Sequence, residues 1–108
     1  MKYHNVKVKV NGETFDSRKE ANRYCELKLM QRAGKITDLK RQVSYLLIPA
    51  QYDEEGNLME RAVNYKADFV YQKDCELVVE DTKGVKTDVY IIKRKLMLFV
   101  YGIRVVET

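Results

Sequence analysis

An aspartate and a lysine separated by one residue come at the end of the most apolar strand in the sequence. Leu77–Val79 predicts a buried strand, and the chain then continues into Asp81 and Lys83. Because side chains alternate faces along a strand, Asp81 and Lys83 share one face. A carboxylate beside an ammonium can bind a hard cation on one side and contact a phosphate or water on the other. A surface ion pair of little energetic weight would have the same spacing, so the rest of the chain has to distinguish the two.

The composition predicts one soluble domain, residues 1–108. The chain is 45% hydrophobic and 33% charged, which suits a globular fold with a modest core. No apolar run approaches the roughly 20 residues that span a bilayer. The first five residues lack the apolar segment of a signal peptide. We therefore expect a cytoplasmic protein with no membrane partner.

Histidine and cysteine are too scarce to carry catalysis. His4 is the only histidine, which argues against hydrolases that use a histidine base. Cys25 and Cys75 are too few and too far apart for a zinc site, and we expect free thiols, with Cys25 packed and Cys75 at a turn. Any catalysis must then use carboxylates, lysines and a metal. The net charge of +4 is modest evidence for a polyanionic partner.

A hairpin and a capped helix are predicted at the start of the chain. Val6–Val10 alternates with lysines and reaches Asn11-Gly12, which favours a type I′ turn and a hairpin over residues 1–16. Ser17 and Glu20 then form a capping box that opens a helix, and Gly34 closes it. The predicted apolar stripe of this helix consists of Ala21, Tyr24, Leu27 and Met30.

Three strands are expected next, near Val43–Ile48, Arg61–Tyr71 and Leu77–Lys83, with a polar hairpin loop between the first two. In the second strand one face should carry Val63, Tyr65, Ala67 and Phe69, and the other Asn64, Lys66, Asp68 and Val70. We expect antiparallel pairing to separate Asp68 from Asp81 unless a bend or bulge lies near Asp68.

A second helix is predicted over Val89–Tyr101, capped by Thr87 or Asp88 and ended by Gly102. Its expected buried stripe is Val89, Ile92, Leu96 and Phe99. Ile103–Val106 should form the last strand, parallel to the third through a right-handed helical crossover.

In this order of elements the chain resembles the PD-(D/E)xK nuclease superfamily, and within it the small phage-encoded nucleases described as Holliday-junction-resolvase-like. The resemblance rests on Asp68 late in the second strand, Asp81-x-Lys83 at the end of the third, and Phe15–Ala21 at the first helix. It covers almost the whole chain. It implies an α/β fold with a restriction-endonuclease-like αβββαβ core over residues 17–108, in which helices flank a mixed sheet. A phage-encoded protein would act in the host cell cytoplasm.

The resemblance also assigns roles. Asp68 and Asp81 match metal ligands, Lys83 matches the catalytic lysine, and the backbone carbonyl of Thr82 is a further ligand in many members. Glu20 matches the first-helix glutamate that completes many such sites, although it also fits as a helix cap alone.

At two positions the sequence departs from the superfamily pattern or leaves the assignment ambiguous. Ala67 stands where the superfamily name has proline, which is a common variation. Glu80 competes with Asp81 for the ligand position, but the spacing to Lys83 favours Asp81 and leaves Glu80 to pair with a helix lysine.

The implied activity is a metal-dependent DNA endonuclease that acts on phage replication or recombination intermediates, including branched DNA, and leaves 5′-phosphate and 3′-hydroxyl ends. Carboxylate and carbonyl oxygens suit Mg²⁺ or Mn²⁺, which activates a bound water and draws charge from the phosphate. The neighbouring carboxylates should keep Lys83 protonated. We therefore expect Lys83 to orient the water or to stabilise the developing charge, in preference to acting as a general base.

Two other functions stay open. In a non-catalytic nucleic-acid-binding module the carboxylates would be structural and basic side chains would contact phosphates. A protein-interaction domain would use Tyr45, Tyr65 and Tyr71, which suit a sheet core equally well. Candidate DNA contacts under either nucleic-acid hypothesis are Lys66, Lys86, Lys93 and Arg94, and the binding-module hypothesis adds Lys95. Junction cutting needs two active sites in fixed geometry and so implies a homodimer, for which no stretch of sequence identifies the interface.

Overall fold

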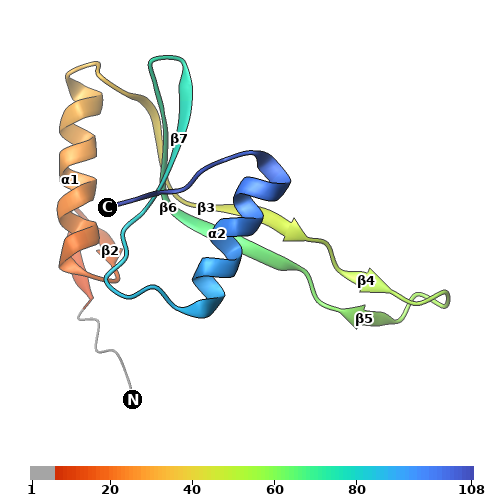
Figure 1. Ribbon diagram of the computed structural model, residues 1–108. Coiled ribbons are helices and arrows are strands. Elements are labelled where there is room, and N and C mark those ends of the chain that lie inside the picture. The colour runs from red at the N-terminus through yellow and green to blue at the C-terminus, as the bar shows by residue number, and fades with distance from the viewer. Residues whose placement is uncertain (1–6) are drawn as a thin grey trace.

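The computed structural model describes residues 7–108. Its elements in chain order are β1 (Val8–Val10), β2 (Glu13–Phe15), α1 (Arg18–Arg32), β3 (Thr37–Ile48), β4 (Gln51–Tyr52), β5 (Leu58–Glu60), β6 (Val63–Lys73), β7 (Glu76–Asp81), α2 (Asp88–Tyr101) and β8 (Val106–Glu107). The fold is α/β, with a mixed sheet in the order β3–β6–β7–β8 and helices α1 and α2 packed beside it (Figure 1). The predicted order of helix, three strands, helix and strand is confirmed, and β4 and β5 are inserted between the first two core strands.

The N-terminal hairpin and α1 begin as the sequence predicts. Asn11 and Gly12 have φ angles of 51° and 84°, the two positive values that a type I′ turn requires. The Ser17 hydroxyl accepts a hydrogen bond of 3.1 Å from the backbone N–H of Glu20. Val6 and His4 lie outside the described residues. Cys25 is exposed instead of packed, because its neighbour Tyr24 takes the buried position.

Strand β6 changes the face that it presents to the core at Asp68. Tyr65 and Ala67 pack in the hydrophobic cluster under α2, whereas Phe69 and Tyr71 pack in the cluster under α1. A regular strand would place all four on one side, as the sequence argument expected. The chain therefore bends at Asp68, and β3 also departs from extended geometry there, since its facing residue Gln42 has a φ of 53°.

The last two core strands are shorter than predicted. Strand β8 is parallel to β7, as expected, but begins at Val106 and not at Ile103. Strand β7 ends at Asp81, opposite Glu107. Because its parallel neighbour β8 ends at the same level, Lys83 lies in the loop beyond β7 and not in the strand.

Helix α2 buries a different face from the one predicted. Thr87 is its N-cap, and Gly102 ends it with a φ of 69°. The buried residues are Tyr90 and Met97, while Ile92 and Phe99 of the expected stripe are exposed. Apolar side chains occur on nearly all sides of this helix, so their spacing does not single out one face.

A hairpin arm, residues 49–62 with β4 and β5, extends from the end of β3 and β6 away from the rest of the molecule (Figure 1). The arm contributes to the elongated shape, whose principal extents are 53 × 40 × 24 Å. Neither helix in the described part of the chain has the length and apolarity needed to cross a membrane.

Candidate metal centre

Asp68 and Asp81 face each other across β6 and β7. The pairing of these strands ends with Phe69 opposite Glu80, and one further step in the same register sets Asp68 opposite Asp81. Directly opposed side chains of an antiparallel pair lie on the same face and touch. The sequence argument required a bend near Asp68 to bring them together. The chain does bend there, but the register alone sets them opposite, because the turn at Asp74–Cys75 lies midway between them in sequence.

Asp81 is a buried carboxylate with one anchored oxygen. The Tyr65 hydroxyl donates to its Oδ2 at 2.6 Å. Its Oδ1 accepts no hydrogen bond from the described residues and lies 3.5 Å from the Lys83 ammonium. That ammonium is also 4.6 Å from the centre of the Tyr90 ring, a favourable cation–π contact. Burial and the Asp81 carboxylate both raise the pKa of Tyr65, so its hydroxyl keeps its proton and stays a donor.

Asp68 is held from two sides. Its Oδ2 accepts the backbone N–H of Thr82 at 2.8 Å, and its Oδ1 accepts the side-chain amide of Gln42 at 3.4 Å. Burial first, and then the negative charge of Asp81, raise the pKa of Asp68 to about 6. The opposed carboxylates are therefore unfavourable as a pair of charges, and a cation between them would remove this repulsion.

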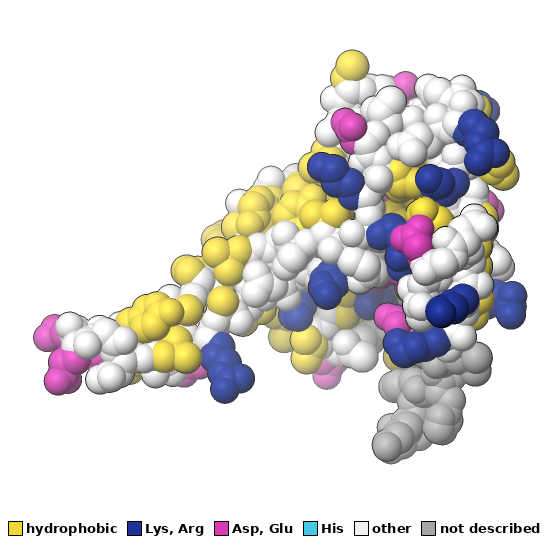
Figure 2. Space-filling model, turned by 180° about the vertical axis from the view of Figure 1, so that it is seen from behind, with side chains coloured by type: hydrophobic (Ala, Val, Ile, Leu, Met, Phe, Trp, Pro, Cys, Tyr) yellow, Lys and Arg dark blue, Asp and Glu magenta, His cyan; other side chains and the backbone are white. Residues whose placement is uncertain are grey.

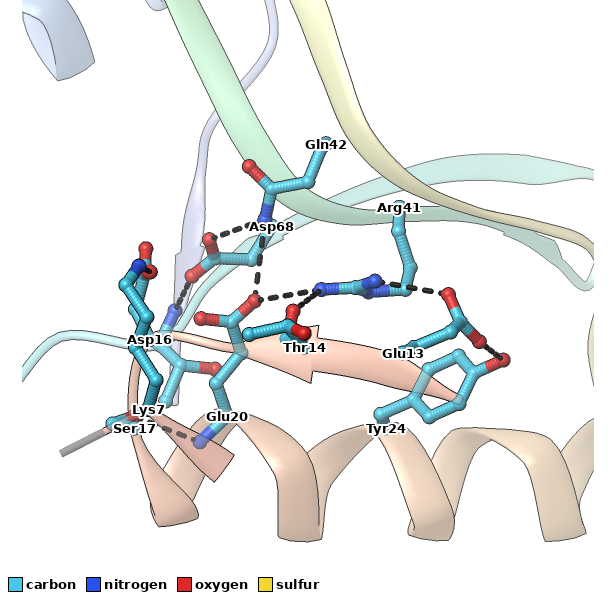
Figure 3. Close-up of polar contacts among 11 residues, drawn as sticks. Lys7, Glu13, Thr14, Asp16, Ser17, Glu20, Tyr24, Arg41, Gln42 and Asp68 are labelled. Carbon is cyan, nitrogen blue, oxygen red and sulfur yellow. Dashed lines mark hydrogen bonds and ion pairs between the residues drawn. The ribbon is translucent and has the colours of Figure 1, made fainter. Parts of the chain in front are cut away.

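Glu20 points toward this pair and not back to the helix cap. Its Oε2 accepts the Gln42 amide at 3.2 Å and lies 3.5 Å from the Arg41 guanidinium (Figure 3). It is 4% exposed, and its burial, followed by the charge of Asp68, raises its pKa. The capping interaction uses the backbone of Glu20, which leaves its carboxylate available to the site.

Glu20 and Asp68 line a cavity of about 370 Å³ between the start of α1 and the loop after β7, whereas the buried Asp81 is not among its lining residues. Its walls include Glu20, Asp68, Thr82 and Lys83. Lys19 also lines it and donates to the backbone carbonyl of Lys83 at 3.3 Å, which links α1 to that loop. The cavity thus has carboxylates on its walls and two ammonium groups beside them.

A divalent cation fits the donor set, although the ligands are not fully assembled. Among residues 7–108 no three acidic, histidine or cysteine side chains form a ready cluster. Gln42 instead lies between Glu20 and Asp68. The unbonded Oδ1 of Asp81 and the facing Asp68 carboxylate are the hard oxygen donors that Mg²⁺ prefers. Because Mg²⁺ keeps several waters, two direct carboxylates suffice.

Comparison with known proteins gives a family. A family model described as "Protein of unknown function (DUF1064)" matches residues 1–106. The chain belongs to the DUF1064 family. Searches of curated proteins and of solved structures gave no significant match.

In this DUF1064 protein the Glu80 carboxylate forms an ion pair with helix α1. The Arg23 guanidinium of α1 binds it through two hydrogen bonds, of 2.9 and 2.7 Å, and the Tyr71 hydroxyl also donates to it. The expected helix partner was a lysine; the observed one is an arginine, whose planar fork matches a carboxylate. Glu80 therefore faces α1, while Asp81 faces the cluster under α2.

The structure does not gather the basic residues proposed for DNA contact at the cavity. Lys66 is exposed on β6, and Lys93 is half-buried on α2. Lys86 and Arg94 each form a 3.0 Å ion pair with Glu107. None of these four is among the residues that line the cavity.

Sequence reasoning missed Lys19 and Gln42 at this DUF1064 site, and it did not assign the Tyr65 hydroxyl to Asp81. Lys19 precedes Glu20 in the first turn of the helix, so its position beside a proposed ligand was a usable signal. Gln42 gave no such signal, because its place opposite Asp68 depends on the pairing of β3 with β6.

Proposed function

We propose that this protein is a metal-dependent DNA endonuclease that hydrolyses phosphodiester bonds. The observation that carries the proposal is the opposition of Asp68 and Asp81, with an unbonded buried oxygen on Asp81 and the Lys83 ammonium 3.5 Å from it. A buried carboxylate that faces a second, half-buried carboxylate is costly to a fold. A bound divalent cation would offset the repulsion between them, whereas a structural ion pair with Lys83 would need only one of the two carboxylates.

Asp68 and Asp81 would hold the metal, and Glu20 would bind its waters. When bound, Mg²⁺ or Mn²⁺ supplies an activated water and neutralises charge on the phosphate. The Thr82 N–H fixes the orientation of Asp68, and Tyr65 does the same for Asp81. The Lys83 ammonium then stabilises the negative charge that develops on the phosphate oxygens.

The cavity is suited to a phosphodiester. Its volume of about 370 Å³ lies in the range of ligand pockets, and Lys19 and Lys83 supply positive charge to balance the acids. The resemblance to phage-encoded nucleases extends the proposal to replication and recombination intermediates, including branched DNA.

Cleavage of defined DNA substrates tests the proposal. Purified protein is incubated with Mg²⁺ or Mn²⁺ and with supercoiled plasmid, linear duplex or a four-way junction. We expect metal-dependent products with 5′-phosphate ends from at least one substrate, and none from Asp81→Ala. Asp74→Asn is the matched control, because Asp74 is exposed on a turn with a φ of 51° that asparagine tolerates.

The alternatives predict different results. Salt-sensitive DNA binding without cleavage in any metal would favour the nucleic-acid-binding module. Neither DNA binding nor metal binding would favour a protein-interaction domain. Equal cleavage by wild type and Asp81→Ala would point to a contaminating nuclease and refute the site.

A further inference from the structure

The outer face of α2 carries large apolar side chains that nothing in the described chain covers. Phe99 is 86% exposed and Ile92 is 57% exposed, and Val89 lies on the same helix with 62% exposure. In contrast, α1 has one large apolar side chain, Leu29, among the exposed residues. A helix that is apolar on nearly all sides is normally covered on all sides. The outer face of α2 therefore has the character of an interface.

The arm carries a second apolar surface. Tyr52, Leu58 and Met59 are 61%, 52% and 66% exposed. Among residues 7–108, strands β4 and β5 pair only with each other, and no layer packs on the arm. Seen from behind, hydrophobic side chains form a band along the arm that continues onto the body, and acidic side chains gather at its end (Figure 2).

The two surfaces have complementary charges. Glu54 and Glu55 at the tip of the arm are exposed. Beside the outer face of α2 is a cavity of about 290 Å³ lined in part by Lys95 and Arg104. Both are exposed, and neither forms an ion pair with the residues that the structure describes.

We propose that two copies of this chain form a symmetric dimer by exchanging arms. The arm of one protomer packs Tyr52, Leu58 and Met59 on Ile92 and Phe99 of its partner, and its acidic tip meets the cavity at Lys95 and Arg104. In a two-fold dimer each contact occurs twice, because the same surface patch serves both subunits. The proposal is independent of the nuclease activity and gives the interface that paired cleavage would need.

A second copy fits these surfaces better than DNA does. The arm ends in carboxylates, which phosphates repel, and it exposes the large apolar side chains of Tyr52, Leu58 and Met59. The acidic tip of the arm and the basic cavity beside α2 belong to the same chain, so two identical chains carry both complementary surfaces. The arm points away from the rest of its own molecule, so the contact must form between molecules (Figure 1).

A charge-reversal experiment tests the proposal without any assay of activity. Variant A carries E54K and E55K, and variant B carries K95E and R104E. Each variant alone sets like charges against each other at both copies of the contact. A mixture of A with B restores opposite charges at both, so only the mixture should dimerise. Sedimentation velocity on full-length chains measures the association, and circular dichroism checks that every variant is folded.

The expected results are specific. Wild type should associate with a Kd in the micromolar range or tighter, variants A and B alone at least roughly tenfold more weakly, and the A–B mixture with an affinity near that of wild type. Phe99→Ser should weaken association by roughly tenfold or more without unfolding, because Phe99 is 86% exposed. The exchange of Lys73 and Glu76, exposed on the β6–β7 turn, is the control that should change nothing.

Other outcomes overturn the proposal. Wild type that stays monomeric up to about 200 μM has no such dimer. Dimerisation that survives in A, B and Phe99→Ser uses another surface. Monomeric A and B that also fail to associate when mixed show that the arm and the α2 cavity do not meet. Loss of DNA binding by Phe99→Ser in a monomeric protein assigns the surface to DNA instead.

Discussion

The Tyr65 hydroxyl donates a 2.6 Å hydrogen bond to Oδ2 of Asp81 from within the hydrophobic cluster under α2. Both residues are buried, so the bond fixes the carboxylate in one orientation, in which Oδ1 accepts no hydrogen bond from the described residues and lies 3.5 Å from the Lys83 ammonium. A tyrosine of the sheet core thereby positions a proposed metal ligand. The Tyr65 ring packs in the hydrophobic core, and its hydroxyl orients the Asp81 carboxylate.

Replacement of this tyrosine should separate the two roles. We expect Tyr65→Phe to lower the free energy of unfolding by roughly 1–3 kcal/mol, because it removes a hydrogen bond to a buried carboxylate. It should also weaken Mg²⁺ binding by roughly ten- to a hundredfold, as lost partners of metal ligands do. Isothermal titration and thermal melts measure the two effects. The control is Tyr45→Phe, whose hydroxyl makes no hydrogen bond with the described residues, and an unchanged metal affinity in Tyr65→Phe would contradict the positioning role.

Asp68 should cost stability in the metal-free protein. Its pKa is raised to about 6, above the value near 3.8 expected in the unfolded chain. Between about pH 4 and 6, Asp68 is therefore protonated in the native state and ionised in the unfolded state. The free energy of unfolding falls as the pH rises through this range.

Asp68→Asn removes this cost while keeping an oxygen that can accept from Thr82. Without metal at pH 7.5 we expect a gain of about 2 kcal/mol, a rise of several degrees in Tm. Mg²⁺ should raise the Tm of wild type but not of the variant. A metal-free variant less stable than wild type at pH 7.5 would show that Asp68 stabilises the fold instead.

Gln42 is a neutral bridge between two acids, and a third carboxylate there should make the site depend on metal. Its amide donates to Glu20 at 3.2 Å and to Asp68 at 3.4 Å. Gln42→Glu replaces both bonds with repulsion, so the metal-free Tm should fall by several degrees at pH 8. Mg²⁺ should restore most of the loss. Gln51→Glu on the arm is the control, and an equal fall in that variant would attribute the effect to net charge.

Lys83 should matter for cleavage and not for metal binding. Its ammonium is 3.5 Å from Asp81 and 31% exposed, which suits a group that contacts the phosphate. Lys83→Met should reduce the single-turnover rate by roughly a hundred- to a thousandfold, as loss of one transition-state donor does. Mn²⁺ affinity should hold or increase, because a positive charge is removed. Lys73→Met, on an exposed turn, should leave both quantities unchanged; a parallel loss of metal binding in Lys83→Met would indicate collapse of the site.

Local signals in the sequence predicted the elements that depend on local chemistry. Asn11-Gly12 specified the first turn, and Ser17 specified the start of α1, although the Glu20 carboxylate contacts Gln42 and does not complete the predicted capping box. Asp81 was singled out by its spacing to Lys83 and Asp68 by the family resemblance, and the structure sets the two opposite each other. Their role as metal ligands stays a prediction.

Features that depend on long-range pairing could not be read from the sequence. The bend at Asp68 and the position of Gln42 follow from how β3 pairs with β6. The choice of Tyr90 and Met97 as the buried face of α2 is set by the sheet, because the helix has apolar side chains on nearly all sides. Within a helix of this kind the periodicity of apolar residues carries little information.

Glu107 ties the last strand to α2 and should contribute to stability in a pH-dependent way. It accepts the Tyr90 hydroxyl at 2.7 Å and pairs with Lys86 and Arg94 at 3.0 Å. These partners, Tyr90 first, lower its pKa from 4.5 to about 2. The unfolded state takes up a proton as the pH falls through about 4.5, before the native state does. The stabilisation is therefore complete above about pH 5 and is lost progressively between pH 5 and 2.

Glu107→Gln should accordingly lower the Tm at pH 7 and flatten its dependence on pH between 5 and 2. Wild type and variant should converge near pH 2, which thermal melts across this range would show. Glu60→Gln on the exposed arm is the matched control and should follow the wild-type curve. A constant difference between Glu107→Gln and wild type from pH 7 to 2 would mean that Glu107 acts through packing and not through its charge. The variant also releases Lys86 and Arg94 from an internal partner, so tighter and more salt-sensitive DNA binding is expected if these two cations contact phosphates.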